Sequence, residues 1–312
     1  MRRLAVLVLA VLAIGAAAGC SETTSSGKEA TVEDRPVRVV TTVNFLADMA
    51  ERIGGDRVEA ESLMGPGVDP HLYKASAGDV GTLRDADVVL YVGLELEGRM
   101  ADLLEELSAE RRTVAVTEDM PRDQLLRPAE FEGRYDPHVW FDVPLWTDAA
   151  RRIAAELRDV DPSHAAEYDR RLRAYLAELD GLHTEVRSLL RDVPERSRVL
   201  ITSHDAFNYF GRRYGFDVVA IQGVSTQTEA TTADIERVAG VIADREVRSV
   251  FIESSVPRQT IEAVIAAARE QGQQTSLGGE LFSDAAGDEG TPEGTYVGMV
   301  AHNARTIGAG LR

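Results

Sequence analysis

Apolar residues along the chain follow two alternating spacings, and this alternation predicts repeated strand–helix units. Short apolar runs rich in β-branched residues predict buried strands, because the strands of a parallel sheet are covered on both faces. Apolar residues that recur every three or four positions predict amphipathic helices between them. The predicted strands are residues 37–43, 58–64, 88–92, 113–116, 199–203, 218–221, 249–253 and 274–279. The helices that follow them are residues 44–53, 77–84, 94–107, 144–160, 205–214, 231–245, 257–271 and 296–311.

One helical pattern, residues 164–190, is longer than the others and separates the two series of units. Asp161-Pro162-Ser163 precedes it and favours a helix start, because proline is well tolerated in the first turn. A helix of this length spans about 40 Å. We therefore predict an α/β fold in which two (β/α) lobes with parallel sheets are joined by a long rigid linking helix. Such a linker is expected to keep motions between the lobes small.

The amino-terminal residues have the pattern of a bacterial lipoprotein signal peptide. A short basic start precedes an apolar run, residues 4–18, that is too short for a comfortable transmembrane helix. The sequence Ala-Ala-Gly-Cys ending at Cys20 then resembles a lipobox, whose cysteine is lipidated and becomes the new amino terminus. The alternative is a free cysteine beside an ordinary signal peptide.

These patterns divide the chain into five predicted segments. They are a signal peptide with lipobox Cys20 (1–20), a flexible tether rich in serine, threonine and acidic residues (21–35), an amino-terminal (β/α) lobe (36–162), the linking helix (163–193) and a carboxy-terminal (β/α) lobe (194–312).

The charge and the cysteine count of the chain argue against some classes of binding partner and metal site. The chain has 312 residues and a formal net charge of −18, which argues against nucleic acid because phosphates would be repelled. The charge fits attraction of cations, and it equally fits a solvated acidic surface. Cys20 is the single cysteine, so an internal disulfide and a thiolate metal cluster are both excluded.

Two near copies of an Asp-Pro-His triplet stand out among six histidines: Asp69-Pro70-His71 and Asp136-Pro137-His138, each followed by an apolar residue and an aromatic one. Proline fixes φ and pushes the residue before it into an extended conformation, so each histidine starts from a stiff loop backbone. An aspartate two residues earlier is a candidate partner for one imidazole nitrogen, which would leave the other free for a metal.

Two further candidates follow predicted strands of the second lobe. His204 comes directly after residues 199–203, and Asp284 comes soon after residues 274–279. Ligands of parallel α/β sheets bind beyond the carboxyl ends of strands, so we expect a metal site in the cleft between the lobes. Taken alone, His204 could be a neighbour of a helix N-cap or a packed core histidine, and Asp284 could be a loop or cap residue.

Together with His71 and His138, these residues make three imidazoles and a carboxylate, a set that suits zinc and also manganese or ferrous iron. Asp69, Asp136 and Asp205 are candidates for orienting the histidines, although each could instead cap or turn the backbone.

The motifs resemble those of metal-specific solute-binding lipoproteins of ABC importers, most closely the TroA-type zinc/manganese subgroup. Residues 69–71, 136–142 and 203–210 are similar to the three histidine motifs, and 279–284 with 293–299 are similar to the motif of the fourth ligand. The resemblance runs from about residue 37 to the carboxyl terminus. It implies two (β/α) lobes, a rigid linking helix, a metal held between the lobes by His71, His138, His204 and Asp284, and no catalysis.

Two features leave the metal open. Many zinc-specific members carry a histidine-rich loop before the second motif, whereas residues 122–134 contain no histidine. Many manganese-specific members have glutamate where this chain has His204. The Irving–Williams order predicts that zinc binds more tightly in vitro, whichever metal is transported.

We therefore expect an extracytoplasmic, membrane-anchored lipoprotein, at the periplasm or at the outer face of the cell membrane. It would act as a monomer, bind no nucleic acid, and deliver Zn²⁺ or Mn²⁺ to the membrane permease of an ABC importer. One alternative is a zinc-dependent hydrolase with an open coordination position for water, although the chain lacks a helical histidine pair with a general-base glutamate. The other alternative is a surface adhesin on the same scaffold.

Overall fold

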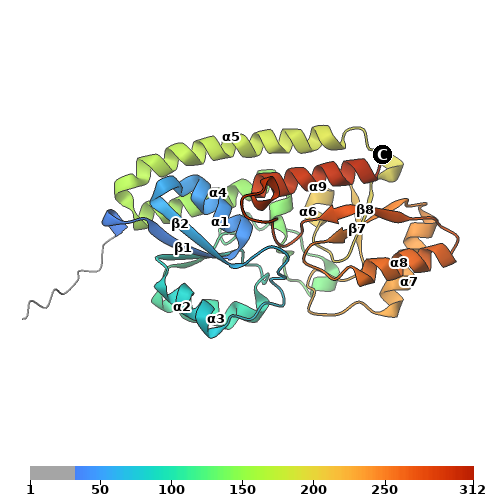
Figure 1. The fold of residues 1–312 in the computed structure, drawn as a ribbon, viewed down its shortest axis with the longest axis horizontal. Coiled ribbons are helices and arrows are strands. Elements are labelled where there is room, and N and C mark those ends of the chain that lie inside the picture. The colour runs from blue at the N-terminus through green and yellow to red at the C-terminus, as the bar shows by residue number, and fades with distance from the viewer. Residues whose placement is uncertain (1–31) are drawn as a thin grey trace, which may run out of the picture.

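The computed structural model describes residues 32–312, which form two α/β lobes lying side by side along one long helix (Figure 1). The predicted signal peptide, Cys20 and residues 21–31 of the predicted tether lie outside the described residues. The rest of that tether contacts the first lobe, because Val32–Asp34 forms a 3₁₀ turn and Arg35 donates to both carboxylate oxygens of Asp87 at 2.6 and 2.8 Å.

The first lobe contains a four-stranded parallel sheet in the order β2-β1-β3-β4. Its strands are β1 (Val37–Val43), β2 (Val58–Met64), β3 (Val88–Tyr91) and β4 (Thr113–Ala115). Helices lie on both faces of this sheet, with α1 and α4 above it and α2 and α3 below it in Figure 1. They are α1 (Asn44–Gly54), α2 (Ala77–Asp85), α3 (Ala101–Glu110) and α4 (Val143–Val160).

The second lobe repeats the alternation with two pairs of parallel strands, β5–β6 and β7–β8, and β5 lies next to β7. The strands are β5 (Val199–Thr202), β6 (Asp217–Ala220), β7 (Ser249–Glu253) and β8 (Ser276–Leu281). The helices are α6 (Asn208–Tyr214), α7 (Thr232–Asp244), α8 (Gln259–Glu270) and α9 (Tyr296–Gly310). Because the carboxyl ends of parallel strands share one edge of a sheet, each lobe presents its strand ends toward a common junction.

The linking helix is α5 (Ala165–Leu190), which has 26 residues and lies along both lobes (Figure 1). Helix α9 lies beside it, and its first residue contacts the first lobe. The Tyr296 backbone N–H donates to Asp48 at 2.9 Å, and its hydroxyl donates to the Trp140 carbonyl at 2.7 Å. The predicted linking helix is thus confirmed, and α9 is a second helical connection between the lobes.

The larger hydrophobic core is shared between the lobes. It includes the first lobe, α5, α9 and the aromatic residues of α6, whereas a smaller core lies under α7 and α8. A shared core resists independent motion of its parts, because close-packed side chains cannot slide without opening voids. The two lobes are therefore expected to move only slightly against each other.

Two predicted helices begin three or more residues later than expected. Residues 94–107 were predicted as one helix, but Gly93, Leu94 and Glu95 have positive φ angles and α3 starts only at Ala101. The turn directs the buried carboxylate of Glu97 back onto the end of β3, where it accepts from the N–H groups of Val92 and Gly93 at 2.8 and 3.1 Å. Burial raises the pKa of this carboxyl group.

Helix α6 likewise starts at Asn208 rather than at residue 205. Within residues 32–312, no helix combines the length and the apolar character needed to span a membrane.

Candidate metal centre

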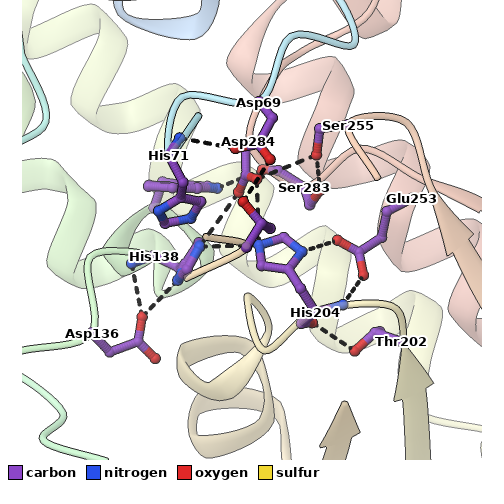
Figure 2. Close-up of polar contacts among 12 residues, drawn as sticks. Asp69, His71, Asp136, His138, Thr202, His204, Glu253, Ser255, Ser283 and Asp284 are labelled. Atoms are coloured by element: carbon purple, nitrogen blue, oxygen red, sulfur yellow. Dashed lines mark hydrogen bonds and ion pairs between the residues drawn. The ribbon is translucent and has the colours of Figure 1, made fainter. Parts of the chain in front are cut away.

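Four side chains meet where the lobes join: those of His71, His138, His204 and Asp284 (Figure 2). Each offers one potential ligand atom, and these four atoms lie within 4.8 Å of one another. All four residues are fully buried. The structure therefore brings together the complete set of ligands that the sequence suggested.

Each of the four follows the carboxyl end of a strand. His71 follows β2 through a Gly-Pro-Gly turn, and His138 ends the long loop after β4. His204 lies just beyond β5, and Asp284 just beyond β8. The turn before His71 requires glycine, because Gly67 has a φ of +71° and an added Cβ would lie 3.2 Å from the Ser254 carbonyl oxygen of the other lobe.

His138 is oriented by the aspartate of its own motif. Asp136 Oδ1 lies 2.8 Å from His138 Nδ1 and also accepts from the His138 backbone N–H at 2.9 Å. This contact favours the proton on Nδ1 and leaves Nε2 facing the centre of the cluster. There Nε2 lies 3.4 Å from Asp284 Oδ1 and 3.3 Å from His204 Nε2.

The first motif uses its aspartate differently. Asp69 Oδ1 accepts from the His71 backbone N–H at 2.9 Å, and no contact joins Asp69 to the imidazole nitrogens. Its second oxygen accepts from the Thr226 hydroxyl of the second lobe at 2.6 Å. The second oxygen of Asp136 similarly accepts from Asn208 of the second lobe at 3.2 Å. Each motif aspartate thus fixes the backbone of its histidine and links it to the opposite lobe.

His204 is oriented by Glu253, a residue that sequence reasoning missed. Glu253 Oε2 lies 2.5 Å from His204 Nδ1, and Oε1 accepts from the backbone N–H groups of Ser203 and His204 at 2.7 and 2.9 Å (Figure 2). Asp205, the residue expected to orient His204, instead accepts from Asn208 at 2.8 Å. The available signal was a glutamate directly after three apolar residues at the end of strand β7.

The buried side chains of the cluster shift one another's pKa values. Burial opposes charge on His138, but Asp136 and Asp284 raise its pKa to about 9. Burial likewise opposes charge on His204, yet Asp284 and Glu253 raise the pKa of that imidazole well above its usual value. The two imidazoliums in turn hold the pKa of Asp284 well below its usual range, although burial acts in the opposite direction. Burial lowers the pKa of His71 to about 3, so that imidazole is neutral.

The polar atoms of the cluster fit a divalent transition-metal ion. Both imidazole nitrogens of His71 and Oδ1 of Asp284 are buried and lack a hydrogen-bond partner. Buried polar atoms without partners are costly, and a cation among them would give a partner to Asp284 Oδ1 and to one imidazole nitrogen of His71. Three imidazole nitrogens and one carboxylate oxygen form the donor set of a tetrahedral zinc site, and they also suit manganese or ferrous iron.

Because protons on His138 and His204 must leave before a cation binds, affinity is expected to fall as pH falls. Between about pH 8 and pH 6, each displaced proton weakens binding by up to about tenfold per pH unit. Isothermal titration of Zn²⁺ in buffers of different ionisation enthalpy would count the released protons. An affinity independent of pH over this range would contradict the assignment of protons to these imidazoles.

Replacing Glu253 with glutamine is expected to weaken Zn²⁺ binding by about 10- to 100-fold. If the side-chain oxygen of the introduced glutamine accepts from the same backbone N–H groups, its NH₂ group faces His204 Nδ1. The NH₂ group donates to Nδ1 and therefore favours the tautomer that carries its proton on Nε2, the nitrogen that faces the metal. Competition with a chromophoric chelator would measure the loss. The matched control is Glu280→Gln on the neighbouring strand β8, and equal effects of the two substitutions would refute an orienting role for Glu253.

Comparison with known proteins agrees with this geometry. The family model described as ZnuA, zinc-uptake complex component A periplasmic, matches residues 39–310. The manganese-binding lipoprotein MntA of Bacillus subtilis (strain 168) is 45% identical over 307 residues, covering 98% of this chain and 99% of MntA. The zinc-binding protein TroA of Treponema pallidum (strain Nichols) is 46% identical over 301 residues and 96% of both chains.

The solved structure of the periplasmic zinc-binding protein TroA superposes with a TM-score of 0.86 at 47% identity, covering 88% of this chain and 99% of that chain. A more distant relative, the metal ABC transporter substrate-binding lipoprotein SsaB of Streptococcus sanguinis, is 28% identical over 317 residues, which cover 100% of this chain and 99% of SsaB. The chain therefore belongs to the ZnuA family of metal-binding substrate-binding proteins.

Proposed function

We propose that this protein captures a divalent metal ion, Zn²⁺ or Mn²⁺, and delivers it to the permease of an ABC importer. The observation that carries the proposal is the convergence of four buried ligand atoms within 4.8 Å between two lobes. His71, His138, His204 and Asp284 would hold the ion, Asp136 and Glu253 would orient two of the imidazoles, and Asp69 and Asp205 would support the surrounding backbone and hydrogen bonds. The ion is cargo, and the family consists of substrate-binding proteins rather than enzymes.

The identity of the cargo is not decided by similarity, since MntA is named for manganese and TroA for zinc at nearly equal identity to this chain. Ligand chemistry favours Zn²⁺ in vitro, because imidazole is a softer donor than carboxylate and zinc lies above manganese and iron in the Irving–Williams order. Fe²⁺ remains compatible with the same donors.

We further propose that the chain works as a lipid-anchored monomer outside the cytoplasm, with Cys20 as the lipidated residue. The relatives MntA and SsaB are named lipoproteins, and substrate-binding proteins of ABC importers work with a membrane permease and its ATPase. In this proposal residues 1–20 are the signal peptide and 21–35 the tether. Residues 36–162 and 194–312 are the lobes, and 163–193 are the linking helix. Membrane fractionation of cells that express the Cys20→Ser variant tests the anchor. If Cys20 carries the lipid, this variant should be lost from the membrane fraction.

The contacts of Asp284 suggest how the ion leaves. Its segment extends from β8 of the second lobe, yet it is hydrogen-bonded to the first lobe on both sides. Trp140 Nε1 donates to the Ser283 carbonyl at 3.1 Å, and the Asn44 side chain exchanges two hydrogen bonds with the Ala286 backbone at 2.8 and 3.0 Å. By contrast, the contacts that hold His204 in place come from Glu253 of its own lobe. In this proposal, release begins with a local rearrangement of the second lobe that moves His204 away from the other three residues, because the linking helix and the shared core keep motions between the lobes small.

The direct test uses protein that begins at Ser21. Mass spectrometry of the metal content should find one equivalent of zinc or manganese, and competition between the two ions should rank them. Protein that binds neither ion at one equivalent would refute the proposed function.

A further inference from the structure

The two oxygens of Asp284 lie in different surroundings, and this difference bears on which metal the proposed site selects. Oδ2 lies 3.3 Å from the Ser255 hydroxyl and 3.3 Å from His204 Nε2. Oδ1 has no hydrogen-bond partner and lies 3.4 Å from His138 Nε2. Each oxygen thus lies near one imidazole, and Oδ2 alone also accepts from a hydroxyl group.

The direction of the contacts follows from the number of protons. The ionised carboxylate of Asp284 accepts only, so the Ser255 hydroxyl must donate its one proton to Oδ2. Ser255 Oγ also lies 2.8 Å from Ser283 Oγ, and this contact can form only if Ser283 is the donor. The hydroxyls of Ser283 and Ser255 therefore form a short relay that ends on Asp284 (Figure 2). Both serines are buried, and in a buried chain each hydrogen bond strengthens the next.

The end of β7 supports both candidate ligands of the second lobe. Glu253, the last residue of the strand, orients His204, and Ser255 two residues later contacts Asp284. The backbone between them is fixed to the neighbouring strand, because the Ser254 N–H donates to the Leu281 carbonyl at 2.9 Å. Ser255 is thus held in place by the sheet rather than by a free loop.

We propose that Ser255 is a positioning residue that determines the selectivity of the site between Zn²⁺ and Mn²⁺. By donating to Oδ2 it leaves Oδ1 as the stronger donor, so that Asp284 offers the cation one oxygen instead of two. One oxygen and three imidazoles complete the four-coordinate site that zinc prefers. Mn²⁺ favours more oxygen ligands, and a chelating carboxylate would supply them. This inference rests on the proposed function.

Replacing Ser255 with alanine removes the donor and frees Oδ2 to bind the cation. We expect the ratio of Zn²⁺ to Mn²⁺ affinity to fall about tenfold, the scale on which outer contacts tune metal sites. Ser255→Thr keeps the hydroxyl and should restore the ratio. The matched control is Ser254→Ala, because the Ser254 hydroxyl is buried next to Ser255 and has no hydrogen-bond partner.

Competition titrations with both ions would be read together with the visible spectrum of the Co²⁺-loaded protein. Four-coordinate Co²⁺ absorbs much more strongly than five-coordinate Co²⁺, so Ser255→Ala should lower the absorption while Ser254→Ala leaves it unchanged. An unchanged affinity ratio and spectrum, or an equal loss of both metals, would overturn the role of Ser255. Wild-type protein that binds neither ion would overturn the proposed function itself, so the wild-type titration distinguishes the two failures.

Discussion

The His138→Ala variant is expected to bind Zn²⁺ about 100-fold more weakly than the wild type. Zinc sites with four protein ligands bind with about 10–16 kcal/mol, or roughly 3 kcal/mol for each ligand, which corresponds to about two orders of magnitude in Kd. His138 is fully buried, and its Nε2 faces both His204 and Asp284. Alanine cannot bind the ion, so water would occupy the coordination position that His138 fills in the wild type. Competition with a chelator of known affinity measures the change.

The matched control for this variant is His302→Ala. The partly exposed His302 side chain contacts the Glu280 carbonyl and Thr306 in the second lobe and is not part of the cluster. It should leave zinc affinity unchanged, while both proteins keep the far-ultraviolet circular dichroism of the wild type. Equal losses in the two variants, or an unchanged affinity in His138→Ala, would contradict the assignment of His138 as a ligand.

The largest expected effect on stability comes from Trp146→Ala, which should lower the free energy of unfolding by about 3–5 kcal/mol. Trp146 is fully buried on α4, and its ring packs against those of Phe45, Trp140 and Tyr296 at centroid distances of 6.1, 6.3 and 6.2 Å. These partners come from α1, the loop of the second motif and α9. Truncation would leave a cavity where the linking elements meet the first lobe, and such a core cannot collapse to fill it.

Unfolding by denaturant, followed by circular dichroism, measures this loss. A chelator must be present, because a bound ion adds its own binding free energy to the stability of the folded state. Trp146→Phe retains most of the ring volume and should cost only about 1–2 kcal/mol. If Trp146→Ala were no less stable than Trp146→Phe, this aromatic cluster would not be the centre of the shared core. Without denaturant, both variants should still bind one equivalent of zinc, since Trp146 does not contact the ligands.

Part of the metal site could be predicted from local sequence patterns. The Asp-Pro-His triplets identified His71 and His138, because the proline and the aspartate act within three residues of the histidine. For His138 the same local reasoning also identified the orienting group, Asp136. For His71 it did not, because Asp69 contacts only the backbone of its histidine. Both aspartates have the same spacing, and the direction of each imidazole depends on what packs around it.

Contacts between distant residues were beyond this reasoning. Glu253 orients His204 from 49 residues away, and Thr226 reaches Asp69 from 157 residues away. Neither pair has a sequence spacing that any local rule connects. The late start of α3 was missed for a similar reason, because it depends on the buried carboxylate of Glu97 and its contact with Thr42 on β1.

By itself, the sequence determined the alternation of strands and helices, the long linking helix and the four residues offered as ligands. The strands, the helices and the choice of His71 and His138 depend on spacing or backbone stiffness within a few residues, and such local preferences act before the chain has folded. The choice of His204 and Asp284 depends instead on their place after predicted strands and on the resemblance of their motifs to those of metal-binding lipoproteins. Only the tertiary structure decided that Asp136 contacts the imidazole of its histidine, that Asp69 contacts only the backbone of its own, and that both aspartates link the lobes. It also decided that Glu253 and Ser255 support the ligands of the second lobe and that α9 joins α5 in holding the lobes together. These features arise from packing between segments far apart in the chain, where the available partners exist only once both sheets have formed.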